Sequence, residues 1–193
     1  MVQYLEDYSP SYFDNAARTA LTNIVSSNPQ NPDILIRIVG QFDDENLITI
    51  IRPYISPQYS NKVRWSGLLA MSRLGAATAT ASILDRVGSR EINDDWIYYI
   101  LPDIIYTKNK TLIDLLVEQL YLDDRNCLPG DPDATSEINC AFRILESLAP
   151  IIEDFPIGTK ESGDLDVRNY RRALETARSW FTENPDYKLV STL

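Results

Sequence analysis

The residues that could perform chemistry in this chain are carboxylates and two cysteines, because histidine is absent from its 193 residues. Without histidine there is no general base for a serine or cysteine nucleophile of the triad type, and no imidazole ligand for a metal. Cys127 and Cys140 are too few thiols for a four-ligand zinc site. Their spacing allows a disulfide without requiring one, and we expect a loop thiol and a buried helical thiol instead.

The carboxylates do not form a recognisable catalytic or metal-binding pattern. Asp43-Asp44-Glu45 and Asp94-Asp95 stand at the starts of predicted helices, where the positive end of the helix dipole favours acidic side chains. The segment from Asp131 begins like a calcium loop, but Ser136 and Phe142 stand where an EF-hand needs glycine and glutamate. The sequence also lacks a glycine-rich phosphate loop of the GxxxxGK type. We therefore expect no catalytic residue, no cofactor and no metal.

The charge of the chain restricts its partners. Eighteen basic residues against 28 acidic residues give a formal net charge of −10. Proteins that bind nucleic acid or anionic membranes present basic surfaces to phosphates, so we expect neither partner. Residues 123–166 hold eleven acidic and three basic residues, which places −8 of the charge on two predicted loops and the helix between them. Such a field speeds encounter with a cationic protein, although a solubilising insertion would have the same composition.

The N-terminus and the hydropathy of the chain predict a cytoplasmic protein. Residues 1–7 have neither the basic start nor the apolar run of a secretory signal. Every apolar stretch is far shorter than the roughly 20 residues that a membrane-spanning helix needs.

Apolar residues recur three and four positions apart, which is the helical period. Plausible N-caps precede several of these runs, at Asn31, Ser60 or Asn61, Asn93, Asn109 and Ser136. Pro53, Pro102 and Pro150 fall inside predicted helices, where we expect kinks or helix boundaries. The predicted helices span residues 11–26, 32–42, 44–56, 61–74, 78–88, 93–107, 110–122, 137–153 and 165–182.

The apolar positions also repeat at intervals of about 32 residues. Four helices have apolar core positions with the same internal spacing, and shifts of 30, 32 and 33 residues along the chain bring each set onto the next. The helices that pair with them repeat their apolar positions in the same way. Two helices per repeating unit, stacked in series, are typical of an α-solenoid, whereas a non-repeating helical bundle is the alternative. The four sets are Ala17, Ala20, Leu21 and Val25; Leu47, Ile50, Ile51 and Ile55; Ala79, Ser82, Ile83 and Val87; and Leu112, Leu115, Leu116 and Leu120.

The segment 61–75 resembles the first helix of a HEAT repeat. That family favours Val-Arg, then a small residue with leucines, then a Leu-Gly stop, and the matching residues are Val63, Arg64, Gly67, Leu68, Leu74 and Gly75. The HEAT-like and armadillo-like superfamily implies an all-α superhelix, here of about four hairpins in a single domain over residues 1–193. The regular repeat is interrupted by an acidic loop at 123–136 and a second loop at 154–164, and a capping helix spans about 165–182.

Two surfaces are the expected binding sites. In HEAT-like proteins the second helix of each hairpin lines the concave face, which here would carry Asp85, Asp114, Glu118 and Tyr121. The acidic loop adds Asp123, Asp124, Asp131 and Asp133. Tyrosine and tryptophan concentrate in the middle third of the chain, as core residues or as an interface. Trp96 and Tyr99 share a predicted helical face and are expected in the core, and the arginines of the last helix are expected in internal ion pairs.

These features predict a non-catalytic protein-binding module whose protein partner has a basic surface. An immunity-type or inhibitor protein that neutralises a basic toxin is a narrower alternative from the same charge. An enzyme of the HEAT-like DNA-glycosylase type is a third alternative. It would need a basic concave groove, which the acidic composition disfavours.

Overall fold

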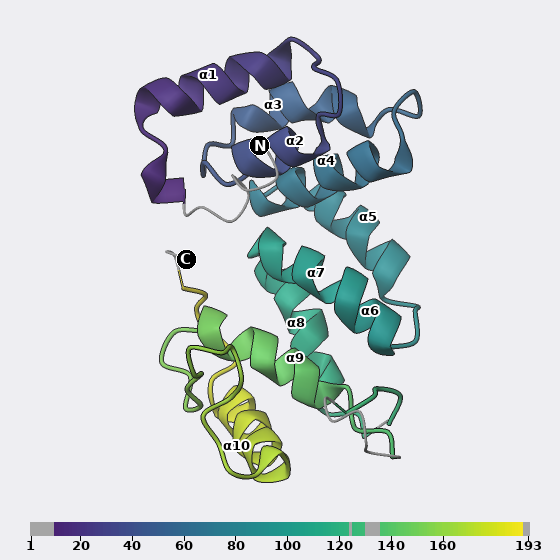
Figure 1. Ribbon diagram of the computed structural model, residues 1–193, viewed down its shortest axis with the longest axis vertical. Helices are drawn as coiled ribbons and strands as arrows, with labels where there is room; N and C mark the ends of the chain where they lie inside the picture. Colours follow the sequence, from purple (N-terminus) through teal and green to yellow (C-terminus); the bar gives the residue numbers. More distant parts are fainter. Residues whose placement is uncertain (1–9, 124, 130–135, 191–193) are drawn as a thin grey trace. The chain divides into compact units, whose positions relative to one another are not determined.

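Figure 1 shows the computed structural model of the protein, which describes residues 10–123, 125–129 and 136–190. Over these residues the fold is all-α, and extended backbone pairs only at three isolated bridges. The chain forms two compact units, residues 1–88 (unit 1) and residues 89–193 (unit 2), where the sequence predicted one domain. No helix in the described part of the chain has both the length and the apolar character to cross a membrane.

Unit 1 consists of short helices that pack on their neighbours along the chain. Its elements are η2 (Pro10–Tyr12), α1 (Asn15–Ser26), α2 (Asp33–Val39), α3 (Leu47–Ile51), η3 (Arg52–Ile55), α4 (Asn61–Arg73) and α5 (Ala77–Val87). α1 packs on α2 and α3, α2 packs against α4, and α4 forms a hairpin with α5. The core of unit 1 therefore lies around α4.

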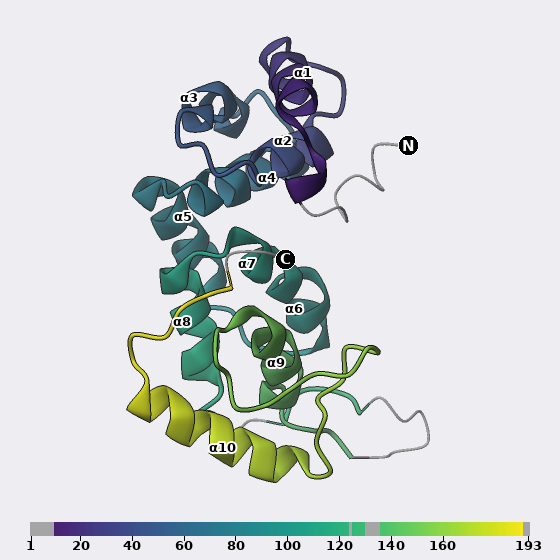
Figure 2. The ribbon, with the colours of Figure 1, turned by 90° about the vertical axis from the view of Figure 1, so that its left-hand side faces the viewer.

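Unit 2 repeats this pattern of neighbour packing and ends in the longest helix. Its elements are α6 (Asp94–Tyr99), α7 (Leu101–Thr107), α8 (Lys110–Gln119), α9 (Ala141–Leu148), η4 (Ala149–Ile151) and α10 (Tyr170–Glu183). α7 packs against α6, α8 and α9, and α9 also contacts α8 and α10. Figures 1 and 2 both show α10 beside α9 at one end of unit 2, in agreement with these contacts.

The three interior prolines each mark a change in helix geometry, as the sequence predicted. Pro53 lies in η3, where α3 tightens into a 3-10 turn, and Pro150 lies in η4 directly after α9. Pro102 lies in the first turn of α7, which is separated from α6 at Ile100. Proline lacks the N–H of the helical ladder and crowds the preceding turn, so the α-helix gives way at each of these positions.

Side-chain caps begin several helices at the residues that the sequence indicated. Ser60, Asn93 and Asn109 accept hydrogen bonds from backbone N–H groups of the first turns of α4, α6 and α8. Two expected caps are wrong. Asn31 adopts a positive φ of 52° in the turn before α2, not the extended backbone of an N-cap. Ser136 lies well before α9, which begins at Ala141.

From the second set onward, the repeated apolar register predicts burial correctly at its first and third positions, whereas Ile50, Ile55, Ser82 and Leu115 are half-buried. The first and third positions of those three sets are all buried: Leu47, Ile51, Ala79, Ile83, Leu112 and Leu116. In α1 only Val25 is buried, and Ala20 is exposed. α1 packs mainly on the α2 and α3 helices that follow it, so fewer of its apolar positions are covered.

The end of α4 is fixed by Gly75, in the Leu-Gly pair of the predicted repeat motif. Gly75 has a φ of 90°, a left-handed backbone conformation that strains residues with a Cβ atom. Its N–H bonds to the Ser72 carbonyl oxygen at 3.0 Å, and the Ala76 N–H bonds to the Met71 carbonyl oxygen at 2.9 Å. This Schellman pattern satisfies the last carbonyls of α4 and turns the chain directly into α5.

Replacing Gly75 by alanine should lower the free energy of unfolding by about 1 kcal/mol, because alanine is strained at this positive φ. Crowding is not involved, since no heavy atom lies within 4 Å of the added Cβ. Gly158→Ala is the matched control, because its site is equally open and lacks a positive φ. Urea denaturation should show a loss for Gly75→Ala only, and equal effects of the two substitutions would contradict this account.

Candidate functional site

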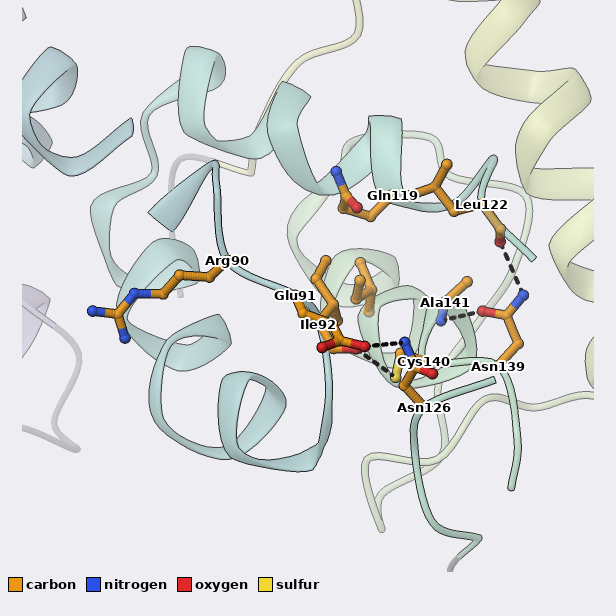
Figure 3. Close-up of a pocket in the computed structure, with 10 residues that line it drawn as sticks. Arg90, Glu91, Ile92, Gln119, Leu122, Asn126, Asn139, Cys140 and Ala141 are labelled. Atoms are coloured by element: carbon orange, nitrogen blue, oxygen red, sulfur yellow. Dashed lines mark hydrogen bonds between the residues drawn. The ribbon is translucent and has the colours of Figure 1, made fainter. Parts of the chain in front are cut away.

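A polar pocket of about 350 Å³ lies in unit 2 beside the start of α9 (Figure 3). Three chain segments form its wall: the connection before α6, the end of α8 with the residues that follow it, and the residues around the start of α9. The lining residues are Arg90, Glu91, Ile92, Gln119, Leu122, Asn126, Asn139, Cys140, Ala141 and Ile144.

Hydrogen bonds within the wall hold several of the pocket's polar side chains. Asn126 Nδ2 donates to Glu91 Oε1 at 3.2 Å. Asn139 Nδ2 donates to the Leu122 carbonyl oxygen at 3.0 Å, and Asn139 Oδ1 accepts from the Ala141 N–H at 2.8 Å (Figure 3). These bonds join the three wall segments to one another.

The lining of this pocket mixes polar and apolar side chains. Glu91 is the one carboxylate among the lining residues, so the pocket lacks the carboxylate pair that glycoside hydrolysis requires. Figure 3 shows the Arg90 side chain directed away from the other labelled residues. Within residues 10–123, 125–129 and 136–190, no group of three or more histidine, cysteine, aspartate or glutamate side chains could hold a metal ion.

A disulfide between Cys127 and Cys140 lies at the edge of this pocket, so the expectation of two separate thiols is wrong. Both cysteines are buried. Cys127 and Ile138 exchange backbone hydrogen bonds, which brings the two ends of the loop together. The Cα atoms of the two cysteines are consequently 5.1 Å apart, within the range that a disulfide spans.

Removing this disulfide should lower the free energy of unfolding by about 3 kcal/mol, the value expected for releasing a loop of this length in the unfolded chain. The double variant Cys127→Ser/Cys140→Ser and treatment of the wild type with dithiothreitol should give similar losses in urea denaturation. Dithiothreitol should have no effect on the double variant. A reduced protein that is as stable as the oxidised one would contradict this expectation.

The residues predicted to bind a partner are distributed over both units. Asp85 is exposed on α5 in unit 1, whereas Asp114 and Glu118 lie on α8 in unit 2, where Glu118 is exposed. The concave face that would unite them stays a prediction. The acidic loop residues Asp124, Asp131 and Asp133 lie outside the described residues.

Three of the predicted residues contact the C-terminal part of unit 2. Tyr187 Oη donates to Asp114 Oδ1 at 2.7 Å, and Tyr121 Oη donates to the Arg178 carbonyl oxygen at 2.8 Å. Arg178 Nη2 pairs with Asp123 Oδ1 at 2.9 Å, as expected for an internal ion pair of the last helix. This hydrogen bond, more than the charge alone, holds the pKa of Asp123 below its ordinary value. The three side chains therefore have an intramolecular role.

Tyr187 is a structural anchor that sequence reasoning missed. It is buried, and Lys110 Nζ lies 4.1 Å from the centre of its ring while also contacting Asp114 at 2.8 Å. Burial first, and the hydrogen bond to Asp114 second, raise the pKa of Tyr187 above its ordinary value. Asp114 and Tyr187 are 73 positions apart, so no local spacing signals their contact.

Tyr187→Phe should lower the free energy of unfolding by about 1 kcal/mol near pH 7, because it removes one hydrogen bond and keeps the ring. The pKa is raised in the folded state, so the hydroxyl's contribution is complete below about pH 10 and is lost as the pH rises further. The gap between wild type and variant in urea denaturation should therefore shrink above about pH 10. Tyr98→Phe, at an exposed ring, is the control and should change little; a gap that does not depend on pH would refute the assignment.

The most exposed aromatic pair of unit 2 lies on α6. Asp94, Asp95, Ile97, Tyr98, Tyr99 and Pro102 line a shallow hollow, here called the α6 surface. Tyr98 is 74% exposed and Tyr99 is 65% exposed, whereas Trp96 is buried. The core position expected for Tyr99 is therefore wrong. At 100° per residue Tyr99 lies about 60° around α6 from Trp96, and the buried stripe of this short helix includes Trp96 and not Tyr99.

Compared with known proteins, the chain matches no family model, and neither a curated protein nor a solved structure matches it significantly.

Proposed function

We propose that this chain is a protein-binding module whose partner is a basic protein. One observation carries the proposal: nearly all of the net charge belongs to unit 2. Residues 1–88 hold 7 basic and 8 acidic residues, a net charge of −1, whereas residues 89–193 hold 11 basic and 20 acidic residues, a net charge of −9. A field of this kind attracts a cationic partner from a distance and raises the rate of association.

A HEAT-like stack of helical hairpins is the arrangement that we propose for each unit. Two observations support it. α4 and α5 form one hairpin and α7 and α8 another, and α2 packs on α4 as α7 packs on α9. The apolar register also repeats as burial from α3 to α5 and α8. α-Solenoids present extended surfaces that bind other proteins.

The negative charge of unit 2 also disfavours the alternative functions that need a basic surface. Phosphates of nucleic acids and anionic lipids would be repelled by a unit of net charge −9, and a DNA glycosylase of HEAT-like type would need a basic groove. An immunity-type inhibitor of a basic toxin remains a narrower form of the proposal. An inhibitor of this type would bind a single partner tightly, whereas a general binding module would bind several basic proteins.

The disulfide favours an oxidising compartment over the cytoplasm that the sequence predicted. Thiols of cytosolic proteins are kept reduced, so a buried structural disulfide such as Cys127–Cys140 persists mainly in secreted or periplasmic proteins or in the lumen of the secretory pathway. We therefore include an oxidising location in the proposal. Its partner should be sought among basic proteins of the same compartment.

The test compares the salt at which captured basic proteins leave the immobilised chain. The unit 2 variant Glu118→Gln/Glu161→Gln/Glu183→Gln removes three exposed charges. The matched unit 1 variant, Asp43→Asn/Glu45→Gln/Asp85→Asn, also removes three exposed charges. Proteins held by the wild type should elute at lower salt from the unit 2 variant and at unchanged salt from the unit 1 variant. Equal shifts for both variants, or retention of no basic protein, would overturn the proposal.

A further inference from the structure

We propose that the α6 surface docks a protein segment that carries an arginine next to an apolar residue. This inference rests on the proposed function, and it names one surface of unit 2 and the chemistry of the partner that fits it. The surface combines exposed aromatic rings, an exposed leucine at its edge and carboxylates on one short helix.

The aromatic part of the surface is a pair of tyrosines that hold each other in place. The rings of Tyr98 and Tyr99 meet edge to face, with centroids 4.8 Å apart and planes at 83°. In this geometry one ring keeps both of its faces clear of the other. Two adjacent tyrosines that are 74% and 65% exposed offer apolar area together with hydroxyl groups. Tyrosine is one of the residue types enriched among those that supply most of the binding energy at protein interfaces.

An apolar side chain extends the surface beyond α6. The Leu128 N–H donates to both oxygens of Asp94, at 3.2 and 3.1 Å. The Leu128 side chain is 61% exposed beside this contact. Asp94 and Tyr98 are four residues apart on α6 and therefore share a face of the helix. Asp94 therefore contacts the backbone of Leu128 and shares a helix face with Tyr98, which places the exposed Leu128 next to the α6 surface.

The carboxylates determine which partner fits. Asp94 and Asp95 occupy the first turn of α6, next to the two rings, and Asp95 is exposed. A guanidinium stacks on a tyrosine face and also pairs with a carboxylate through two parallel hydrogen bonds. A lysine ammonium is a point charge that cannot form the same planar arrangement. Charge complementarity within a unit of net charge −9 therefore favours an arginine-bearing segment over an acidic peptide.

The binding test uses the full chain labelled with ¹⁵N and the peptide acetyl-Leu-Arg-Leu-Arg-amide. Two matched peptides replace arginine by lysine or by citrulline, which keeps the planar group and removes its charge. NMR shift changes on titration should gather at residues 94–103 and at Leu128, should be weaker with the lysine peptide and should be absent with the citrulline peptide. Shift changes spread evenly over unit 2, equal binding of the arginine and lysine peptides, or no measurable binding would overturn the inference.

Substitutions of Tyr98 and Tyr99 test whether their rings bind the arginine peptide. Tyr98→Ala/Tyr99→Ala should weaken binding of the arginine peptide by about tenfold, the loss of one cation–π contact and its buried area. Tyr98→Phe/Tyr99→Phe keeps both faces and should bind nearly as the wild type does. Tyr12→Ala, at a tyrosine of unit 1 that is 77% exposed, is the control. If Tyr98→Ala/Tyr99→Ala still captures basic proteins with wild-type salt dependence, the docking surface is wrong although the proposed function stands.

Discussion

An isolated helix shorter than about 12 residues does not persist in water, because the cost of nucleating it exceeds the gain from its few hydrogen bonds. α3, α6 and α7 have 5, 6 and 7 residues, so each exists only because tertiary packing covers one apolar stripe. Ile51 of α3 and Ile104 of α7 are fully buried, and Trp96 of α6 is nearly so. This dependence on packing fixes how each helix is rotated, and therefore which side chains reach the solvent.

Because packing turns the apolar stripe of each helix inward, the charged side chains of unit 2 lie on its surface. Among the described residues of unit 2, the ion pairs include Lys110–Asp114, Arg143–Glu146 and Arg178–Asp123. The carboxylates of these pairs lie on α8, on α9 and just beyond α8. On α6, Asp94 accepts the backbone N–H of Leu128, which satisfies hydrogen bonding without neutralising the charge. The acidic character of α6 is therefore retained beside its two exposed rings.

The sequence predicts what depends on local chemistry. The prolines predicted where α-helical geometry ends, and Ser60, Asn93 and Asn109 predicted where helices begin. The helical period of the apolar residues predicted most of the core. Contacts between residues that are far apart in the sequence were not predicted. Neither the Cys127–Cys140 disulfide nor the Tyr187–Asp114 bond has a spacing that requires it, since each depends on how loops and the C-terminal segment return to the helices. Tyr99 was misplaced because the buried stripe of the six-residue α6 includes Trp96 and does not extend to Tyr99, and helical spacing alone does not give the width of that stripe.

The disulfide and the α6 surface meet at one short segment of chain. Cys127 is covalently fixed to Cys140, and the next residue, Leu128, donates its backbone N–H to Asp94 at the start of α6. Trp96 holds the other side of α6 in the core of unit 2. α6 is therefore anchored from both sides, by a buried ring and by a cross-linked loop, and Tyr98 and Tyr99 project from a fixed support. An exposed aromatic pair on such a support loses little conformational entropy when a partner covers it, which is the property that favours binding at a small surface.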